Sequence, residues 1–155
     1  MADALKATMP NDTSIQVTRV FDAPMRLVWD AHTKPELVKR WLLGPDGWSM
    51  PKCEIDLRPG GAYLYGWRHH DGRYFEIGGV YEQITPYTEI KHIERFNGAQ
   101  SHCLMRLTEA NGKTTMTLTM DFGSKAARDG AFATGMTTGM ERSYQRLDDI
   151  AAEAA

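Results

Sequence analysis

Apolar and polar residues alternate along residues 14–21, a pattern that predicts a β-strand with one buried face. Ile15 and Val17 lie on the apolar face, and Arg19 falls on the same face. The strand ends before Pro24, which can occupy the first turn of a helix because that turn needs no amide donor there. The alternating pattern therefore predicts a strand followed directly by a helix.

Two short helices are expected next, at residues 24–33 and 35–42. Each begins at a proline and has apolar residues at helical spacing, and Gly44 and Pro45 end the second. From Trp48 the period changes to alternation, broken by Asp-Gly and Asn-Gly pairs typical of tight hairpin turns. We expect an antiparallel meander of six strands. Its approximate limits are 49–57, 61–69, 73–84, 88–96, 101–109 and 113–122.

Residues 124–155 return to helical spacing and predict one long C-terminal helix. Gly130, Gly135 and Gly139 lie inside it, and each glycine costs a helix interior about 1 kcal/mol relative to alanine. Close approach of the sheet or of a bound molecule would compensate for this cost. Residues 1–13 read as a flexible N-terminal tail, and 14–155 as a single domain.

Composition narrows the class of protein. Hydrophobic residues make up 42% and charged residues 25% of 155, the usual mixture of a globular domain. A net charge of −2 without a basic stripe argues against nucleic-acid binding. No apolar run reaches the ~20 residues of a membrane span, and the N-terminus lacks a signal-peptide core, so we expect a cytoplasmic protein. Cys53 and Cys103 are then expected to be reduced.

Four segments in order resemble the START-like (SRPBCC) superfamily, and within it the family of the C-terminal domain of the activator of the 90-kDa heat-shock protein ATPase. They are RVFDAPMRLVWDAHTKPELVKRWLLGP (19–45), CEIDLRPGGAYLY (53–65), GGVYEQITPYTEI (78–90) and GMERSYQRLDDI (139–150). The resemblance implies an α+β helix-grip fold: a curved antiparallel sheet of about seven strands wrapped around the C-terminal helix. It also implies an internal cavity, which relatives use for lipids, polyketides and other apolar molecules.

Methionines gather where that cavity is expected. On the last strand Met116 and Met120 share a face, which must meet the helix, and Met105 lies on the strand before it. The helix adds three candidates, Phe132, Met136 and Met140. Unbranched thioethers adapt to irregular ligands, although an ordinary core filled with methionine gives the same pattern.

Aromatic residues form a second candidate wall. Tyr63, Tyr65 and Trp67 share a face of their strand, and Phe75 and Tyr81 follow on the next strand in one of two possible registers. Pointing inward, these rings would offer a ligand apolar contact and hydrogen bonds. Pointing outward, they would stiffen the sheet as cross-strand pairs.

Trp41 and Trp48 flank the Gly-Pro-Asp-Gly loop, where folding alone favours small polar residues. They could gate the cavity, Trp41 as its roof and Trp48 at its mouth. Alternatively, Trp41 fixes the short helices onto the sheet as part of the core.

Histidines give less specific signals. His92 and Glu94 share a strand face, which is a selectivity site if it points inward and an ordinary surface if it points outward. His32 is expected to cap its helix as a cation. His69 and His70 are adjacent on an extended chain and face opposite ways, so we expect a hairpin turn and no metal site.

No nucleophile, zinc, phosphate-loop or dinucleotide motif occurs, so we assign no catalytic residue and no cofactor. The leading hypothesis is a protein that binds a small hydrophobic or amphipathic molecule, as a monomer or homodimer. An enzyme of the cyclase or hydrolase type is the alternative, and its signature would be an inward His92 hydrogen-bonded to a carboxylate or tyrosine. The family's name adds a third hypothesis, a co-chaperone of the 90-kDa heat-shock protein in the stress response.

Overall fold

The computed structural model describes residues 4–154, and within this range eight strands and four helices form. The strands are β1 (Lys6–Thr8), β2 (Ser14–Phe21), β3 (Trp48–Ile55), β4 (Ala62–His69), β5 (Tyr74–Thr85), β6 (Glu89–Phe96), β7 (Ala99–Ala110) and β8 (Lys113–Asp121). The helices are α1 (Met25–Thr33), α2 (Pro35–Trp41), α3 (Lys125–Ala133) and α4 (Met136–Ala154).

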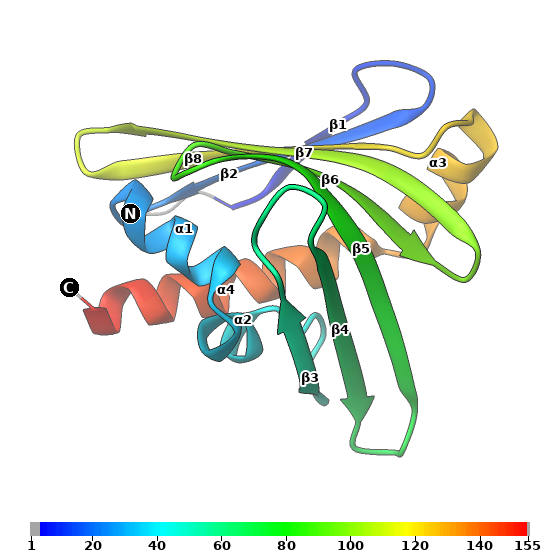
Figure 1. Ribbon diagram of the computed structural model, residues 1–155, viewed down its shortest axis with the longest axis horizontal. Coiled ribbons are helices and arrows are strands. Elements are labelled where there is room, and N and C mark those ends of the chain that lie inside the picture. Colours follow the sequence, from blue (N-terminus) through cyan, green and yellow to red (C-terminus); the bar gives the residue numbers. More distant parts are fainter. Residues whose placement is uncertain (1–3, 155) are drawn as a thin grey trace.

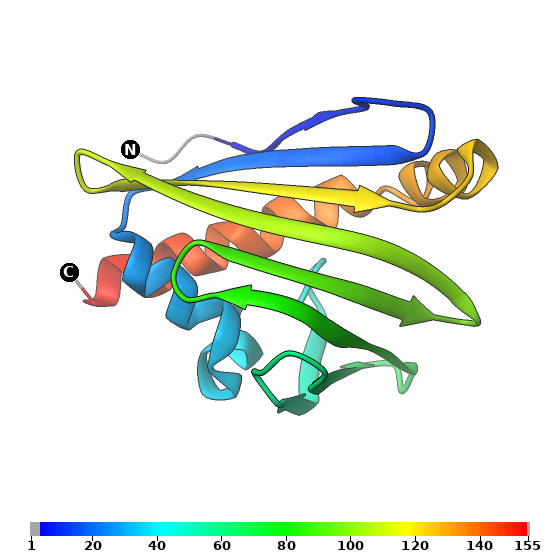
Figure 2. The ribbon, with the colours of Figure 1, turned by 45° about the horizontal axis from the view of Figure 1, so that its top comes forward.

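All eight strands join one antiparallel sheet in the order β1-β2-β8-β7-β6-β5-β4-β3. The sheet bends strongly between β6 and β3, and α4 runs along its concave side (Figure 1). Helices α1 and α2 lie at the end of this concave side where α4 finishes, and α3 lies at the opposite end (Figure 2). This arrangement is the predicted helix-grip fold, with the predicted two short helices and six-stranded meander in place.

Two elements differ from expectation. Lys6–Thr8, inside the segment expected to be a flexible tail, form β1 and pair antiparallel with β2, which gives the sheet an eighth strand. The expected single C-terminal helix is two helices, because Gly135 adopts a left-handed conformation with φ of +78° that ends α3. Of the three glycines, Gly135 is therefore a helix stop and not an interior residue.

Gly139 lies inside α4, and a close approach of another segment offsets the cost of a glycine in a helix interior. A side chain added there would meet the ring of Pro45 at 3.3 Å, so α4 and the loop after α2 approach each other closely at this point. The approaching group is this loop, and not the sheet or a bound molecule as expected. Gly130 lies inside α3 with open space where a side chain would be, so the compensation expected there is absent.

The concave face carries the core. Ile15, Val17 and Phe21 of β2 are fully buried and pack with Tyr144 and Leu147 of α4 in one hydrophobic cluster. The methionine face of β8 points toward the helix as predicted, with Met116 fully buried. A second, smaller cluster of Val38, Met50 and Trp67 lies under β3 and β4. Both cysteines are free, Cys103 buried on β7 and Cys53 half-buried on β3.

Arg19 is the polar exception on the buried face of β2. Its side chain is 2% exposed, and it donates to Glu141 at 2.9 Å and to Asp148 at 2.8 Å, both on α4. Burial alone would raise the pKa of Glu141, but the hydrogen bonds from Arg19 and from the amide of Leu5 hold it below its usual value. The guanidinium fork therefore fixes the helix against the sheet through two turns of α4.

Removing the guanidinium should destabilise the protein strongly. Arg19→Ala leaves two carboxylates without their shared partner, and losing one member of a buried ion pair costs about 3 kcal/mol or more. Urea unfolding of the variant measures this loss. Arg40→Ala, which removes an exposed pair with Glu153, is the control and should cost less than about 1 kcal/mol. Equal losses in the two variants would contradict the role given to Arg19.

Candidate functional site

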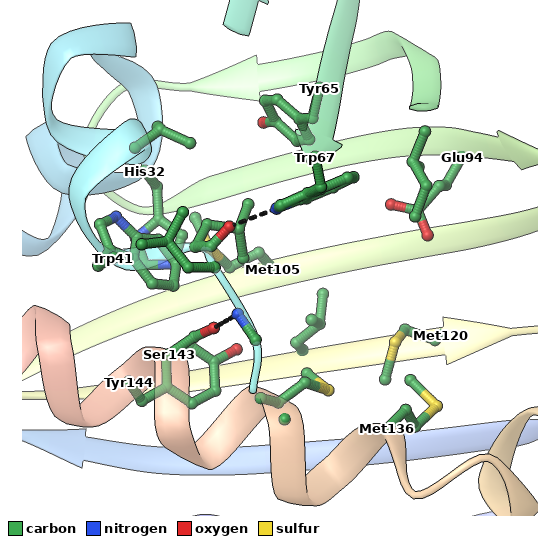
Figure 3. Close-up of a pocket in the computed structure, with 18 of the residues that line it drawn as sticks. His32, Trp41, Tyr65, Trp67, Glu94, Met105, Met120, Met136, Ser143 and Tyr144 are labelled. Atoms are coloured by element: carbon green, nitrogen blue, oxygen red, sulfur yellow. Dashed lines mark hydrogen bonds between the residues drawn. The ribbon is translucent and has the colours of Figure 1, made fainter. Parts of the chain in front are cut away.

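A cavity of about 540 Å³ lies between the concave face of the sheet and α4. Fourteen of the fifteen candidate residues line it (Figure 3). These are Trp41, Trp48, Tyr63, Tyr65, Trp67, Phe75, Tyr81, His92, Glu94, Met105, Met116, Met120, Met136 and Met140. Phe132 was also expected there, but its side chain is 40% exposed on α3 and outside the cavity. The break at Gly135 turns α3 away from the line of α4, and this explains the difference.

Methionines from the sheet and from α4 line part of the cavity. They are Met105 of β7, Met116 and Met120 of β8, and Met136 and Met140 of α4. The strands β7 and β8 are neighbours in the sheet, and α4 lies across the cavity from them, as Met120 and Met136 show (Figure 3). The packing of α4 against the sheet is closer further along, at Tyr144 and Leu147.

Aromatic side chains of β4 and β5 line another part of the cavity. Tyr63, Tyr65 and Trp67 of β4 point inward, and the register in which Phe75 and Tyr81 of β5 accompany them is the one observed. Neighbouring rings contact one another: the centroids of Trp67 and Phe75 lie 5.0 Å apart in a stacked arrangement. The alternative of outward-facing pairs is thereby excluded for these five residues.

The two tryptophans flanking the loop differ in position. Trp41 is 2% exposed, its indole nitrogen donates to the carbonyl of Ala31 at 2.7 Å, and its ring stacks on Tyr144. It joins α1, α2 and α4 as core, so it borders the inner end of the cavity and is not a movable roof. Trp48 is half-buried at the start of β3, in edge contact with His69 and Phe75, and stands at the rim.

The loop between α2 and β3 is hydrogen-bonded to β4 and to α4. Trp67 donates its indole N–H to the carbonyl of Leu42 at 2.7 Å, and the amide of Gly44 donates to the hydroxyl of Ser143 at 2.8 Å (Figure 3). Arg146 donates to the carbonyl of Gly44 at 2.7 Å. Because the exposed residues Pro45 and Gly135 also line the cavity, it reaches the surface between this loop and the α3–α4 junction.

Because Gly79 of β5 has no side chain, the ring of Tyr63 on β4 can extend over β5 as far as β6. Tyr63 is paired with Gly79 on β5, and Gly79 is paired with Glu94 on β6. With no side chain at Gly79, the ring of Tyr63 lies over β5, and its hydroxyl makes a 2.8 Å hydrogen bond with Nδ1 of His92. The open question about the face of β6 is thus resolved, because His92 and Glu94 both point inward.

Burial changes the acidity of these groups. It lowers the pKa of His92 to about 4, so the imidazole is neutral at neutral pH. It raises the pKa of Glu94, whose carboxyl has no ion-pair partner among residues 4–154. Burial and the nearby Glu94 raise the pKa of the Tyr63 phenol. The polar end of the cavity is therefore a set of groups for which charge is unfavourable.

Sequence reasoning missed some lining residues and misassigned one. Ser143 and Tyr144 line the cavity from α4, and their place on the helix face with Met136 and Met140 was the available signal. His32 was expected to be a charged helix cap. It is instead buried beside Trp41, donates from its Nδ1–H to the carbonyl of Val28, and has its pKa lowered to about 4 by burial. His69 contacts Asp71 in the β4–β5 turn, and no metal-binding cluster occurs within residues 4–154.

Comparison with known proteins identifies the family. The family model described as "Activator of Hsp90 ATPase homolog 1-like protein" matches residues 22–152. The chain belongs to this family. It lies in the SRPBCC/START-like superfamily, as the four sequence segments indicated. No curated protein matches the chain. None of the helices within the described residues is long and apolar enough to cross a membrane.

Solved structures of similar fold cover nearly the whole chain. A Rhodobacter sphaeroides protein has a TM-score of 0.91 and 26% identity over 97% of this chain and 99% of its own. A Nitrosomonas europaea protein has a TM-score of 0.85 and 21% identity over 94% and 98%. An AHSA1-like protein of Aeromonas hydrophila has a TM-score of 0.73 and 16% identity over 87% and 93%. These similarities support the family's fold.

Adding one methyl group at Gly79 should disrupt the polar end of the cavity. A Cβ there would lie 2.5 Å from the ring and hydroxyl of Tyr63 and would also press on the Ile93 carbonyl, so the ring must move. We expect Gly79→Ala to cost about 1–3 kcal/mol in urea unfolding, as overpacked sites do. Gly130→Ala, with open space, should be neutral or stabilising. Similar effects of both substitutions would contradict this account.

The neutral histidines predict a pH dependence. Because the pKa of His92 falls from 6.5 to about 4 on folding, the unfolded chain binds the proton first. Its contribution to stability is complete above pH 6.5 and is lost as the pH falls toward 4, at about 1.4 kcal/mol per pH unit. Urea unfolding at several pH values should show a smaller slope for His92→Gln, which keeps an acceptor for Tyr63. Because carboxylates titrate in the same range, the test is the difference between the two proteins, and identical slopes would refute it.

Proposed function

We propose that this protein binds a small hydrophobic or amphipathic molecule in the cavity between the sheet and α4. The observation that supports this most directly is the cavity itself. Its volume of about 540 Å³ lies within the ~300–1,000 Å³ typical of small-molecule sites. Its lining of methionine and aromatic side chains with a few polar groups at one end also matches such sites.

A space of this size is not expected from imperfect packing. Protein interiors are packed as densely as organic crystals, with few voids larger than a water molecule. Here, two hydrophobic clusters pack around the cavity and include many of its lining residues. The hydrogen bonds of Leu42 and Gly44 keep the loop between α2 and β3 at the cavity's edge. These hydrogen bonds hold the loop at the edge of the cavity, and not inside it. A space that remains open in this way favours a ligand as its occupant.

One observation also favours the enzyme alternative. His92 faces the cavity and is hydrogen-bonded to Tyr63, which is the arrangement that acid–base chemistry would need. The electrostatics oppose it, because proton transfer from Tyr63 to His92 would create two charges. Burial lowers the pKa of His92 and raises that of Tyr63, so it disfavours both charged forms. We therefore give binding priority over catalysis for this pair.

Filling the cavity should abolish binding without unfolding the protein. Leu118 lines the middle of the cavity on β8, so Leu118→Trp places an indole in the ligand's space. The neutral apolar dye N-phenyl-1-naphthylamine, which fluoresces in apolar sites, is the probe. We expect the unmodified protein to bind one dye per chain and the variant to lose at least about tenfold in affinity, a change of about 1.4 kcal/mol.

Thr117→Trp is the matched control for this experiment. It adds the same side chain to the same strand, but alternation directs residue 117 to the opposite face of the sheet. Dye affinity should be unchanged in this variant. Equal binding by all three proteins, or no binding by the unmodified protein, would count against the proposal. Native mass spectrometry of the protein purified from cells, followed by denaturing extraction, would identify a co-purified ligand.

A further inference from the structure

Within residues 4–154, Glu94 is the one acidic side chain that lines the cavity. It is half-buried and lies at the cavity wall (Figure 3). Its place on the inner face follows from the register, because it stands in one row with Gly79 of β5 and Ser101 of β7. The carboxyl therefore points into the space that a ligand would occupy.

Within residues 4–154, no side chain neutralises this carboxyl. Among the described residues, none donates a hydrogen bond to Glu94 or pairs with it. Glu141 and Asp148, by contrast, are partly buried carboxylates that both pair with the guanidinium of Arg19. A carboxyl in apolar surroundings with no partner costs the fold free energy, and burial raises its pKa accordingly. Glutamine or leucine at this position would avoid this cost. The stability of the protein therefore does not account for a glutamate here, whereas a bound partner would.

The rest of the lining indicates the charge of the missing partner. No lysine or arginine lines the cavity within residues 4–154, and His92 is neutral. An anionic headgroup such as a fatty-acid carboxylate would meet Glu94 with no cation to offset the repulsion. Tyr63 stands in the same cross-strand row as Glu94, with only Gly79 between them, and the faces of aromatic rings attract cations. Both features favour a positively charged group.

We propose that the ligand is an amphipathic organic cation, with an amine or ammonium group held by Glu94 and an apolar body among the methionines. The nitrogen would lie between the carboxylate and the ring of Tyr63, which stands across Gly79 in the same row of the sheet. The apolar body would extend toward Met120 and Met136. This inference rests on the proposed binding function and specifies the chemical class of its ligand.

Three probes with one ten-carbon chain test it: decylamine, decanol and decanoate, each below its micelle-forming concentration at about pH 8. Three of the protein's four tryptophans line the cavity, so quenching of their fluorescence reports binding. We expect decylamine to bind at least about tenfold more tightly than decanol, and decanoate to bind most weakly. Glu94→Gln should reduce the preference for decylamine to within about twofold while leaving decanol binding nearly unchanged.

The control variant is Glu82→Gln, which removes the same charge from an exposed position on β5 and should keep the full preference for the amine. Thermal unfolding checks that the variants are folded. Glu94→Gln should have a melting temperature equal to or above that of the unmodified protein. Decanol binding as tightly as decylamine, or a preference that survives in Glu94→Gln, would overturn the inference while leaving the binding function intact. Failure of all three probes to bind would count against the binding function itself.

Discussion

The ion pairs between Arg19 and α4 set the distance on which the rest of the structure depends. Arg19 occupies a position of β2 where alternation calls for an apolar side chain, and it reaches Glu141 and Asp148 across the interface. Removing three charged groups from water offsets much of their mutual attraction, so the arrangement contributes position more than net stability. With α4 fixed against β2, the bend of the sheet carries β3, β4 and β5 away from the helix. The cavity occupies the space left between them.

The polar groups of the cavity show how such a space is tolerated. Tyr63 and His92 satisfy each other, and no fully buried side-chain nitrogen or oxygen within residues 4–154 lacks a partner. Glu94 is different because it is half-buried, lines the cavity and has no hydrogen-bond or ion-pair partner among the described residues. Water or a ligand can therefore reach it. An unpaired carboxyl lowers stability in the empty protein, and a cationic ligand would convert that deficit into binding free energy.

The sequence predicted most of the fold because its signals are local. Asp-Gly and Asn-Gly pairs mark the hairpins, and two prolines mark the helix starts, so the strands and short helices lie where expected. β1 was missed because a three-residue exposed strand has no apolar pattern to reveal it. The division of the C-terminal helix depends on the backbone conformation of Gly135, and glycine alone does not reveal which conformation it adopts. Phe132 was misplaced for the same reason.

The sequence could not show which face of β6 points inward, because the answer depends on how far the side chain of Tyr63 extends across the neighbouring strand. His92 and Glu94 alternate with Ile93, so either face of β6 could have been the buried one by hydropathy alone. The deciding contact is between Tyr63 and His92, residues on strands that are not adjacent in the sheet. It forms only because Gly79 of the intervening strand leaves room for the ring. A glycine in a strand between an aromatic and a polar strand is thus a sequence signal for an inward polar site. Recognising that signal requires knowing the register of three strands, which tertiary packing sets.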